Sequence, residues 1–431
     1  MTEFLDDLLI GAVSRRRFLE RLSAAGAAAS VLSGAFPDEV AECQEQPPAP
    51  RTAIGPPKTR GGKDDDNPKY SPDNIGGGGR LERDFYRDWT KKSRVPMAEG
   101  YSIYDAREAE VRPWPEIEGR GLYLNFSGNV HMDGVILEIP EGRALAPRRT
   151  AYEQLIYVLK GRGYTNVGIA PRQQKVEWSE GSLFTVPLNV THRHFNAEAA
   201  QPARLLAVTT FPFMMQVFGS LGMINDLEHD FTERYDGRPG YFSDAKQIHK
   251  RWWRANYVKD LRNADVIPWE ERGKGNASVF WEMGGNTILE PHVSQFPVGT
   301  YKLGHRHPYE AIILTLNGKG FSLAGREGLR ETNNPVKIDW KAGSVVSPPY
   351  FWYHQHFNTG DTLARYWAIT EGDFPKRLGI PLEVEQIEVE QEDPDIRRRF
   401  ERELGHARTS DAHPNPGVHG HSHSHGHEHG R

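Results

Sequence analysis

The chain has 431 residues, which is too long for one ordinary hydrophobic core, so two domains are the first expectation. Its 37% hydrophobic and 26% charged residues exclude a polytopic membrane protein, and its formal charge of -5 supplies no basic surface for nucleic acid. The single cysteine, Cys43, excludes an intramolecular disulfide framework, while 43 Gly and 30 Pro favour short strands joined by turns over a helical bundle.

Residues 1–42 have the composition of a targeting segment: the run SRRRFL at residues 14–19 precedes a weakly apolar stretch of about fifteen residues. That stretch is shorter than the roughly 20 apolar residues that span a membrane. The run resembles the bacterial twin-arginine export signal, with Glu20 where that signal usually has Lys. The resemblance implies recognition by the twin-arginine export machinery and a periplasmic or other extracytoplasmic location. The alternative is a basic amphipathic helix on a cytoplasmic protein.

Residues 43–82 are rich in Pro, Gly and charged residues, and this composition predicts a disordered linker. Lipid anchoring at Cys43 is disfavoured, because Glu42 precedes it where lipoprotein signals have a small residue.

Residues 83–212 contain the runs LIYVLKGRGY, SLFTVPL and ARLLAVTT, which are β-branched and aromatic and are bounded by turn residues. They predict strands and hairpins of a first β unit. Residues 213–275 include MMQVFGSLGMINDLEHDF and DAKQIHKRWWRANYVKDL, whose apolar spacing predicts a helical connection that links or covers the β units.

Residues 276–375 repeat the first unit. The segment 148–161 has the same frame as 305–318, and 181–196 has the same frame as 343–358, at an offset of roughly 160 residues. The strand-like runs recur as AIILTLNGKGF, SVVSPPYFWY and LARYWAIT. The chain therefore contains two copies of one structural unit.

The second unit carries paired histidines after a glycine and, further on, a histidine followed by an asparagine. The residues in this pattern are Gly299, His305, His307, Gly343, Pro349, His354 and Asn358, with Phe351 where the pattern has an inner Gly. The spacing resembles the two motifs of the cupin superfamily, and the duplication resembles a bicupin over roughly residues 120 to 370. The resemblance implies an all-β fold of two cupin barrels (jelly-roll, double-stranded β-helix) with a helical connection.

A metal site is predicted in the second unit. His305 and His307 are two residues apart on a strand, so both side chains face the barrel interior, where His354 can complete a set of three imidazoles. In the first unit Arg148 and Thr150 replace the paired histidines and leave only His192, so that barrel is expected to be structural.

The carboxylate ligand of this site is an open question in the sequence. Ala311 occupies the usual cupin Glu position, and Glu310 lies one residue early, which turns its side chain to the opposite face unless a bulge intervenes. The ligand set is therefore either three histidines or three histidines with Glu310.

The order His305, Arg306, His307 and Ala311, followed by Trp352, His354, His356 and Asn358, is similar to the gentisate and 1-hydroxy-2-naphthoate dioxygenases. The resemblance implies Fe(II) on three histidines and a dioxygenase that uses O2 to cleave an aromatic or other chelating hydroxy acid. His356 and Tyr353 are the candidates for acid/base roles, against the alternative that both only pack within their strand.

Four residues are candidates for contacts with the substrate. Arg306, Lys302 and Arg365 could pair with a carboxylate, and Trp352 could stack on an aromatic ring. Their alternatives are solvated side chains on a barrel rim and ordinary core packing.

Two other functions stay open. With Glu310 as a fourth ligand and Mn(II) bound, the same fold suits a decarboxylase or isomerase. A non-catalytic exported protein that binds metal or ligand is the third possibility, and a homo-oligomer is expected in each case.

Residues 376–410 predict a charged surface helix, from the segment DPDIRRRFEREL. In residues 411–431 histidines alternate with Gly, Ser and Glu, a pattern that can bind Ni, Zn or Cu loosely. The alternative is a disordered polar tail without a metal role.

Overall fold

A computed structural model describes residues 52–53 and 84–410. The predicted export signal, the linker apart from residues 52–53, Cys43 and the histidine-rich tail lie outside the described residues. No helix of the described part is long and apolar enough to cross a membrane.

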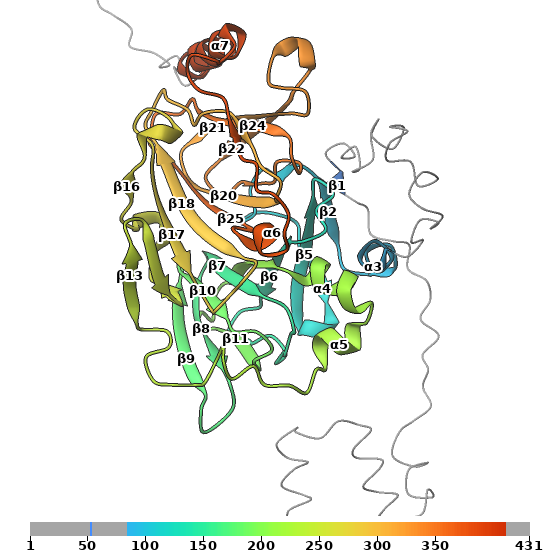
Figure 1. Cartoon of the computed structure of the whole chain (residues 1–431). Coiled ribbons are helices and arrows are strands. Elements are labelled where there is room, and N and C mark those ends of the chain that lie inside the picture. Colours follow the sequence, from blue (N-terminus) through green and yellow to red (C-terminus); the bar gives the residue numbers. More distant parts are fainter. Residues whose placement is uncertain (1–51, 54–83, 411–431) are drawn as a thin grey trace, which may run out of the picture. The chain divides into compact units, whose positions relative to one another are not determined.

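The described chain is mostly β-structure (Figure 1). Its helices are α3 (Phe85–Lys92), α4 (Phe211–Phe218), α5 (Leu221–Asn225), α6 (Phe374–Arg377) and α7 (Pro394–Ser410), with 3-10 turns η3 (Pro115–Ile117), η4 (Leu261–Asn263), η5 (Glu270–Arg272) and η6 (Glu331–Asn333). The strands of the first half are β1 (Thr52–Ala53), β2 (Met97–Gly100), β3 (Ser102–Ile103), β4 (Arg112–Trp114), β5 (Gly119–Phe126), β6 (Asp133–Ile139), β7 (Gln154–Lys160), β8 (Arg162–Val167), β9 (Gln174–Ser179), β10 (Leu183–Val186), β11 (His192–Asn196) and β12 (Ala203–Thr209).

The strands of the second half are β13 (Ala245–His249), β14 (Trp252–Ala255), β15 (Tyr257–Val258), β16 (Ile267–Pro268), β17 (Ala277–Glu282), β18 (Glu290–Phe296), β19 (His305–Arg306), β20 (Ala311–Asn317), β21 (Lys319–Gly325), β22 (Val336–Lys341), β23 (Val345–Val346), β24 (Tyr353–Asn358), β25 (Ala364–Thr370) and β26 (Glu385–Gln386).

Two barrels with matching strand order make up this β-structure. In the N-terminal barrel a nine-stranded sheet runs β1-β2-β5-β6-β12-β7-β10-β15 with β4 on β5, and it faces the smaller sheet β11-β8-β9. In the C-terminal barrel the nine-stranded sheet runs β13-β14-β17-β18-β25-β20-β23-β3 with β16 on β17, and it faces β22-β21-β24-β19-β26. The predicted all-β fold of two jelly-roll barrels is confirmed.

Each barrel borrows a strand from the other half of the chain. β3, near the N-terminus of the described region, pairs with β23 of the C-terminal barrel, and β15 pairs with β10 of the N-terminal barrel. The two halves are therefore interlocked rather than joined by a simple linker.

The helical prediction for residues 213–275 is only partly correct. Helices α4 and α5 are present, but the segment DAKQIHKRWWRANYVKDL forms β13, β14 and β15. Pairing of β14 with β17 and of β15 with β10 overrides the local helical spacing. The expected C-terminal helix begins at Pro394, and β26 precedes it.

A shared core lies between the two large sheets. Leu206 and Val208 of β12 and Trp367 and Ile369 of β25 belong to one cluster of buried side chains, whereas their strand neighbours face the separate barrel interiors. The ring of Trp367 stacks on that of Tyr157 across this interface, at 5.7 Å between centroids. The period of two along each strand thus separates interface residues from barrel-interior residues.

Glycine ends the same strand in both barrels. Gly161 and Gly318 each have φ +87, in the hairpins β7–β8 and β20–β21. A Cβ there would lie 3.1 Å from Cα of Ala203 or 2.8 Å from Cα of Ala364. The repeated glycine therefore reflects both backbone conformation and a close approach.

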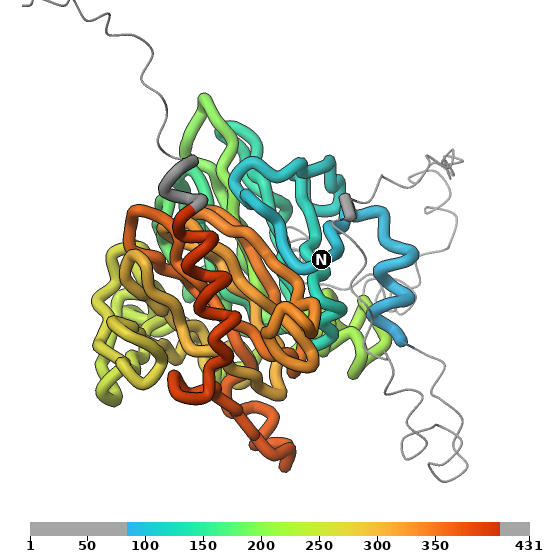
Figure 2. The backbone as a smooth tube through the Cα atoms, turned by 90° about the horizontal axis from the view of Figure 1, so that it is seen from above, coloured from blue at the N-terminus to red at the C-terminus, as the bar shows by residue number. Residues whose placement is uncertain are grey.

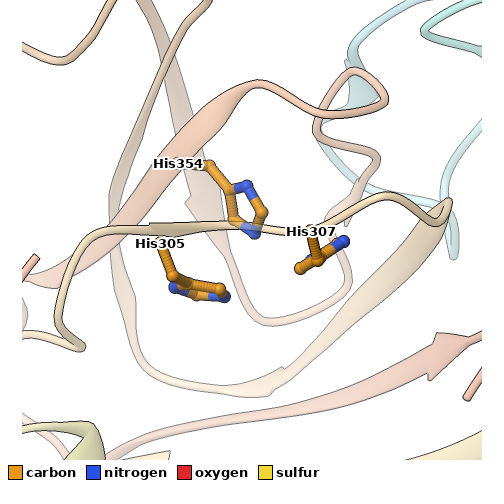
Figure 3. Close-up of side chains that lie close together, drawn as sticks. All are labelled: His305, His307 and His354. Atoms are coloured by element: carbon orange, nitrogen blue, oxygen red, sulfur yellow. The ribbon is translucent and has the colours of Figure 1, made fainter. Parts of the chain in front are cut away.

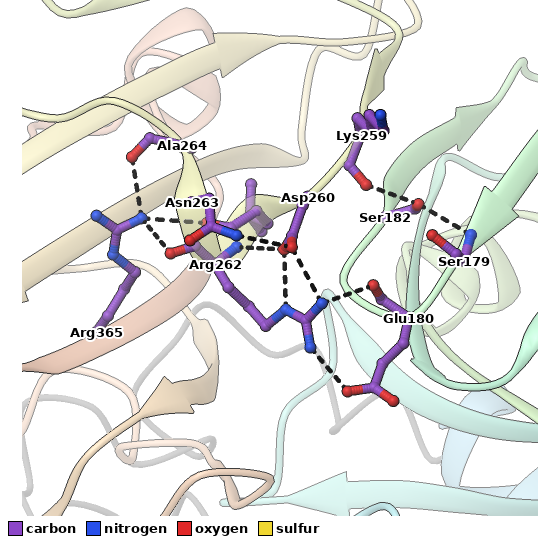
Figure 4. Close-up of polar contacts among 10 residues, drawn as sticks. Ser179, Glu180, Ser182, Lys259, Asp260, Arg262, Asn263, Ala264 and Arg365 are labelled. Atoms are coloured by element: carbon purple, nitrogen blue, oxygen red, sulfur yellow. Dashed lines mark hydrogen bonds and ion pairs between the residues drawn. The ribbon is translucent and has the colours of Figure 1, made fainter.

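In each barrel an arginine binds the segment that follows the strand borrowed by the other barrel. Arg365 on β25 donates to the carbonyls of Arg262 and Ala264, and Arg262 in turn bonds Asp260 and Glu180 (Figure 4). In the N-terminal barrel Arg204 on β12 donates to the carbonyls of Arg107 and Ala109 in the same way.

Helix α7 covers the outer face of the smaller sheet in the C-terminal barrel. Its residues Ile396 and Phe400 pack against Phe321, Leu323 and Phe357, and Figure 2 shows the helix, in red, lying across the orange strands.

Candidate metal centre

Three histidines meet inside the C-terminal barrel. His305 lies on β19, His307 follows it, and His354 lies on β24, which pairs with β19 so that His305 and His354 are directly opposite. One ring nitrogen from each residue lies within 4.8 Å of the others. Figure 3 shows the three imidazoles turned toward one another.

Backbone carbonyls fix the orientation of all three rings. Nδ1 of His305 bonds the carbonyl of Leu303 at 2.9 Å, that of His307 bonds Tyr309 at 2.9 Å, and that of His354 bonds Trp352 at 3.0 Å. A ring that donates from Nδ1 keeps its Nε2 lone pair free for a metal. The arrangement therefore presents three Nε2 atoms to one space.

Burial keeps these imidazoles neutral. It lowers the pKa of His305 and His307 well below the usual value and that of His354 to about 4, and the positive charges of Arg272 and Lys302 lower all three further. Neutral imidazole is the form that binds metal. Three convergent Nε2 atoms fit a divalent transition metal, with coordination positions left open for other ligands.

Glu310 is not part of this histidine cluster; its carboxylate lies instead in a separate group of possible metal donors with His131 and Glu371. Its carboxylate accepts hydrogen bonds from three successive backbone N–H groups, those of Val130, His131 and Met132, at 2.9 to 3.1 Å. The physical reason is the strand period: Glu310 and Ala311 point to opposite faces, and no bulge reverses them.

The N-terminal barrel has the matching contact. The carboxylate of Glu153, the repeat partner of Glu310, accepts from the N–H groups of Thr287, Ile288 and Leu289, and Arg234 pairs with it at 2.9 Å. We call these two features the Glu153 and Glu310 contacts. Each glutamate binds its barrel to the other one.

Arg306 and Tyr353 face out of the barrel, so neither reaches the metal cluster. Both side chains bond Glu385, and the guanidinium of Arg306 lies over the rings of Phe351 and Tyr353 at 4.5 and 4.6 Å. Each lies next to an inward histidine in sequence and therefore points the other way. The structure therefore brings neither the predicted substrate residue Arg306 nor the predicted catalytic residue Tyr353 to the histidine cluster.

Arg365 and Trp352 are also engaged elsewhere. Arg365 lies on the face of β25 opposite Tyr366 and holds the carbonyls described above together with Gln295. The Trp352 ring packs against Tyr101 of the segment that leads into β3, at 6.5 Å between centroids. The structure therefore brings neither of these predicted substrate residues to the histidine cluster.

Lys302 is the one predicted substrate residue that lies inside the barrel beside the histidines. Its side chain is 5% exposed, and Nζ donates to the hydroxyl of Tyr366 at 2.7 Å. Burial, and then the charge of Arg272, lower the pKa of Lys302 well below its usual value.

Sequence reasoning missed Arg272 and His292. Arg272 lies in η5, bonds Gln386 at 2.6 Å and influences every histidine of the cluster electrostatically. His292 on β18 is buried, and burial followed by the charges of Lys302 and Arg272 lowers its pKa. Neither residue lies in a recognisable motif. His292 lies in a strand of mixed polar and apolar residues and Arg272 lies in a turn, so neither position carried a sequence signal that would select it.

His356 lies inside the barrel, but its contacts are those of a structural residue. Its Nδ1 bonds Ser322 Oγ at 2.7 Å, and Trp340 Nε1 donates to the same oxygen. In the N-terminal barrel His194, Thr165 and Trp178 make the same contacts. Because the arrangement recurs in the barrel without a histidine cluster, it favours packing over catalysis for His356.

The corresponding place in the N-terminal barrel holds no comparable cluster among the described residues. His192 keeps its Nδ1 bond to the carbonyl of Val190 and pairs with Arg148 as His354 pairs with His305. Arg148 and Thr150 offer no imidazole, so two of the three metal donors are missing there.

Comparison with known proteins identifies part of the N-terminal barrel. Residues 135–209, from within β6 to the end of β12, match the family model of the cupin domain. No curated protein matches the sequence.

Among solved structures, the chain is similar to a mutant of Bacillus subtilis oxalate decarboxylase, with 12% identity, a TM-score of 0.43, and coverage of 63% of this chain and 77% of the other. It is similar to a mutant of salicylate 1,2-dioxygenase from Pseudoaminobacter salicylatoxidans in complex with gentisate, with 14% identity, a TM-score of 0.44, and coverage of 65% and 80%. The chain thus contains a cupin domain within a fold of two cupin barrels.

Proposed function

We propose that this protein is a metal-dependent bicupin oxidoreductase: a non-haem Fe(II) dioxygenase that cleaves an aromatic or other chelating hydroxy acid in its C-terminal barrel. The observation that carries the proposal is the ligand set. Three neutral imidazoles converge without a protein carboxylate among the clustered donors, and Glu310 is held by backbone N–H groups instead.

The ligand set favours an acid as substrate. Three neutral histidines leave the charge of a divalent ion uncompensated, and Arg272 and Lys302 add positive charge near the same space. An anionic chelating ligand supplies the missing negative charge. When bound, Fe(II) supplies coordination of substrate oxygen atoms and one-electron chemistry with O2.

The protein's own contribution is to hold the metal-binding imidazoles in a fixed orientation and to exclude water from the reacting groups. The carbonyls of Leu303, Tyr309 and Trp352 fix the imidazoles, so little rearrangement accompanies metal binding. The cluster residues are 2 to 7% exposed, so bulk water is largely excluded from the reacting groups.

The test combines metal analysis with oxygen uptake. Full-length protein loaded anaerobically with Fe(II) is mixed with gentisate, salicylate and 1-hydroxy-2-naphthoate, and O2 consumption and loss of the aromatic absorbance are recorded. Stoichiometric O2 consumption with ring cleavage is expected. Turnover of an acid without O2, as by a Mn(II)-dependent decarboxylase or isomerase, would overturn the dioxygenase assignment, and binding without any turnover would point to a non-catalytic protein.

We also propose export by the twin-arginine route and assembly into a homo-oligomer. A fusion of residues 1–42 to a reporter that is active only outside the cytoplasm is expected to report export, and Arg15→Lys with Arg16→Lys is expected to abolish it. Sedimentation of the purified chain measures the oligomeric state. Cytoplasmic retention of the wild-type fusion would contradict the export proposal.

A further inference from the structure

The interior of the C-terminal barrel contains polar residues at positions where the N-terminal barrel is apolar. The hydrogen-bond register matches the two barrels position by position: N–H of Lys302 bonds the carbonyl of His356 as N–H of Leu145 bonds that of His194. The matched pairs, with the C-terminal residue first, are Lys302 and Leu145, Arg272 and Ile117, His292 and Val135, Ser294 and Leu137, and Tyr366 and Leu205. All five residues of the N-terminal barrel belong to its hydrophobic core.

This difference shows that the fold does not need the polar residues. The same strand order closes around leucine, isoleucine and valine in the N-terminal barrel. Burying an amine and a phenol in place of such residues costs several kcal/mol unless they are well paired. A cost that the architecture does not require points to a role in ligand binding.

Lys302 is the centre of this polar set. Its Nζ donates to Tyr366 at 2.7 Å, and Ser294 hydrogen-bonds the same phenol. None of the ion pairs in the described part of the chain includes Lys302. Burial of the amine without a counter-ion, followed by the charge of Arg272, is what lowers its pKa. An incoming carboxylate would supply the missing partner.

The polar set adjoins the metal cluster. The ring of His354 lies 5.7 Å from that of His356, which lies 5.5 Å from that of Tyr366, and Lys302 Nζ lies 5.4 Å from the centre of the Tyr366 ring. The polar set and the histidine cluster therefore share one barrel interior, and the charge of Lys302 influences His305, His307 and His354 there.

We propose that Lys302, held in place by Tyr366, binds the carboxylate of the ligand in the C-terminal barrel, so that this barrel selects small carboxylic acids over neutral analogues. The inference rests on the proposed function only in taking the bound acid to be a substrate. Lys302 is the binding group and Tyr366 is a positioning residue.

The test measures binding to the metal-loaded full chain. Salicylate and its neutral amide, salicylamide, are titrated into wild-type protein and into Lys302→Leu, which introduces the residue of the matched position in the N-terminal barrel. Loss of one charge-assisted contact is expected to weaken salicylate binding about 10- to 100-fold and to leave salicylamide binding and metal content unchanged. Lys302→Arg is expected to restore part of the preference for the acid.

Two further variants keep the inference falsifiable. Lys302→Gln retains a donor toward Tyr366 without the charge, and it decides the matter if Lys302→Leu does not fold. Tyr366→Phe is expected to reduce the ratio of salicylate to salicylamide affinity less than Lys302→Leu does. Lys274→Leu, which removes an exposed lysine outside the barrel, is the control and is expected to bind like the wild type.

Equal affinity for acid and amide in the wild type, or unchanged salicylate binding by metal-loaded Lys302→Leu and Lys302→Gln, would overturn the inference. The outcomes separate it from the proposed function. Lysine-dependent acid binding without O2 uptake supports the inference and refutes the dioxygenase, whereas O2 uptake that is indifferent to Lys302 does the reverse.

Discussion

The two barrels are built alike and differ in what they enclose. Both have a nine-stranded sheet of matching order, a strand borrowed from the other half, an arginine that holds the segment after the strand borrowed by the other barrel, and a glutamate that binds three backbone N–H groups across the interface. The C-terminal barrel alone has a three-histidine cluster among the described residues, together with a buried lysine. The features that both barrels share therefore belong to the architecture. The histidine cluster and the buried lysine, which only the C-terminal barrel has among the described residues, are the candidates for function.

This comparison assigns roles that neither barrel would reveal by itself. The contacts of His356 are matched by those of His194, so they are structural, whereas the contact between Lys302 and Tyr366 is matched by two leucines. The two barrels can thus be compared position by position. A buried polar residue in one barrel that is replaced by an apolar residue in the other is not required by the fold.

The largest effect is expected from removing a ligand. His305→Ala or His354→Ala leaves two imidazoles and should abolish retention of the metal, because two neutral donors do not hold a divalent ion against dilution. His192→Ala, the matched change in the N-terminal barrel, should keep the wild-type metal content. Metal per chain after desalting is the measurement, and a loss in His192→Ala equal to that in His354→Ala would break the distinction between the barrels.

A second metal site should be obtainable by copying the cluster. Arg148→His combined with Thr150→His places three imidazoles on the same frame, since Arg148 already pairs with His192 as His305 does with His354. The metal content is expected to rise from one toward two per chain. Arg148→His alone is the control and should keep one metal ion per chain. An unchanged metal content in the double variant would show that the backbone positions in the two barrels do not match closely enough to form the same site.

The Glu310 contact should matter for stability and not for metal. Glu310→Ala leaves three backbone N–H groups without their acceptor and is expected to lower the free energy of unfolding by about 3 kcal/mol. Glu153→Ala, the matched change, should have a similar effect. Urea unfolding and metal analysis are read together, and loss of metal in Glu310→Ala with unchanged stability would restore Glu310 as a ligand.

A pH-dependent effect on stability concerns two matched carboxyl groups. Burial raises the pKa of Asp133 to about 8 and that of Glu290 to about 7, so each keeps its proton in the folded chain at pH values where the unfolded chain has lost it. Stability is therefore expected to fall by about 1 kcal/mol per pH unit for each group, between about pH 4 and about pH 8 for Asp133 and only up to about pH 7 for Glu290. Asp133→Asn should reduce this slope in urea unfolding at pH 5 to 8. If stability depended on pH equally steeply in Asp133→Asn and in the wild type, the raised pKa of Asp133 would be contradicted.

Local sequence rules predicted the parts of the site that depend on the strand period. His305, His307 and His354 face inward, and the one-residue offset of Glu310 turns it away, because successive side chains on a strand alternate between faces. The repeat likewise predicted two barrels, since it places the same strand and turn signals at matching positions. Which side chains face inward follows from the order of residues along one strand, and the presence of two barrels follows from comparing the two repeats.

Tertiary structure alone decided which polar residue joins the histidines. Lys302, Arg306 and Arg365 are equally basic in the sequence, yet only Lys302 lies inside the barrel, because the others bond Glu385 or carbonyls of a segment about one hundred residues away. The borrowed strands β3 and β15 were also beyond prediction, since their partners β23 and β10 belong to the other half of the chain. Alternation along a strand is a local property of the backbone, whereas pairing between distant segments depends on the whole folded chain.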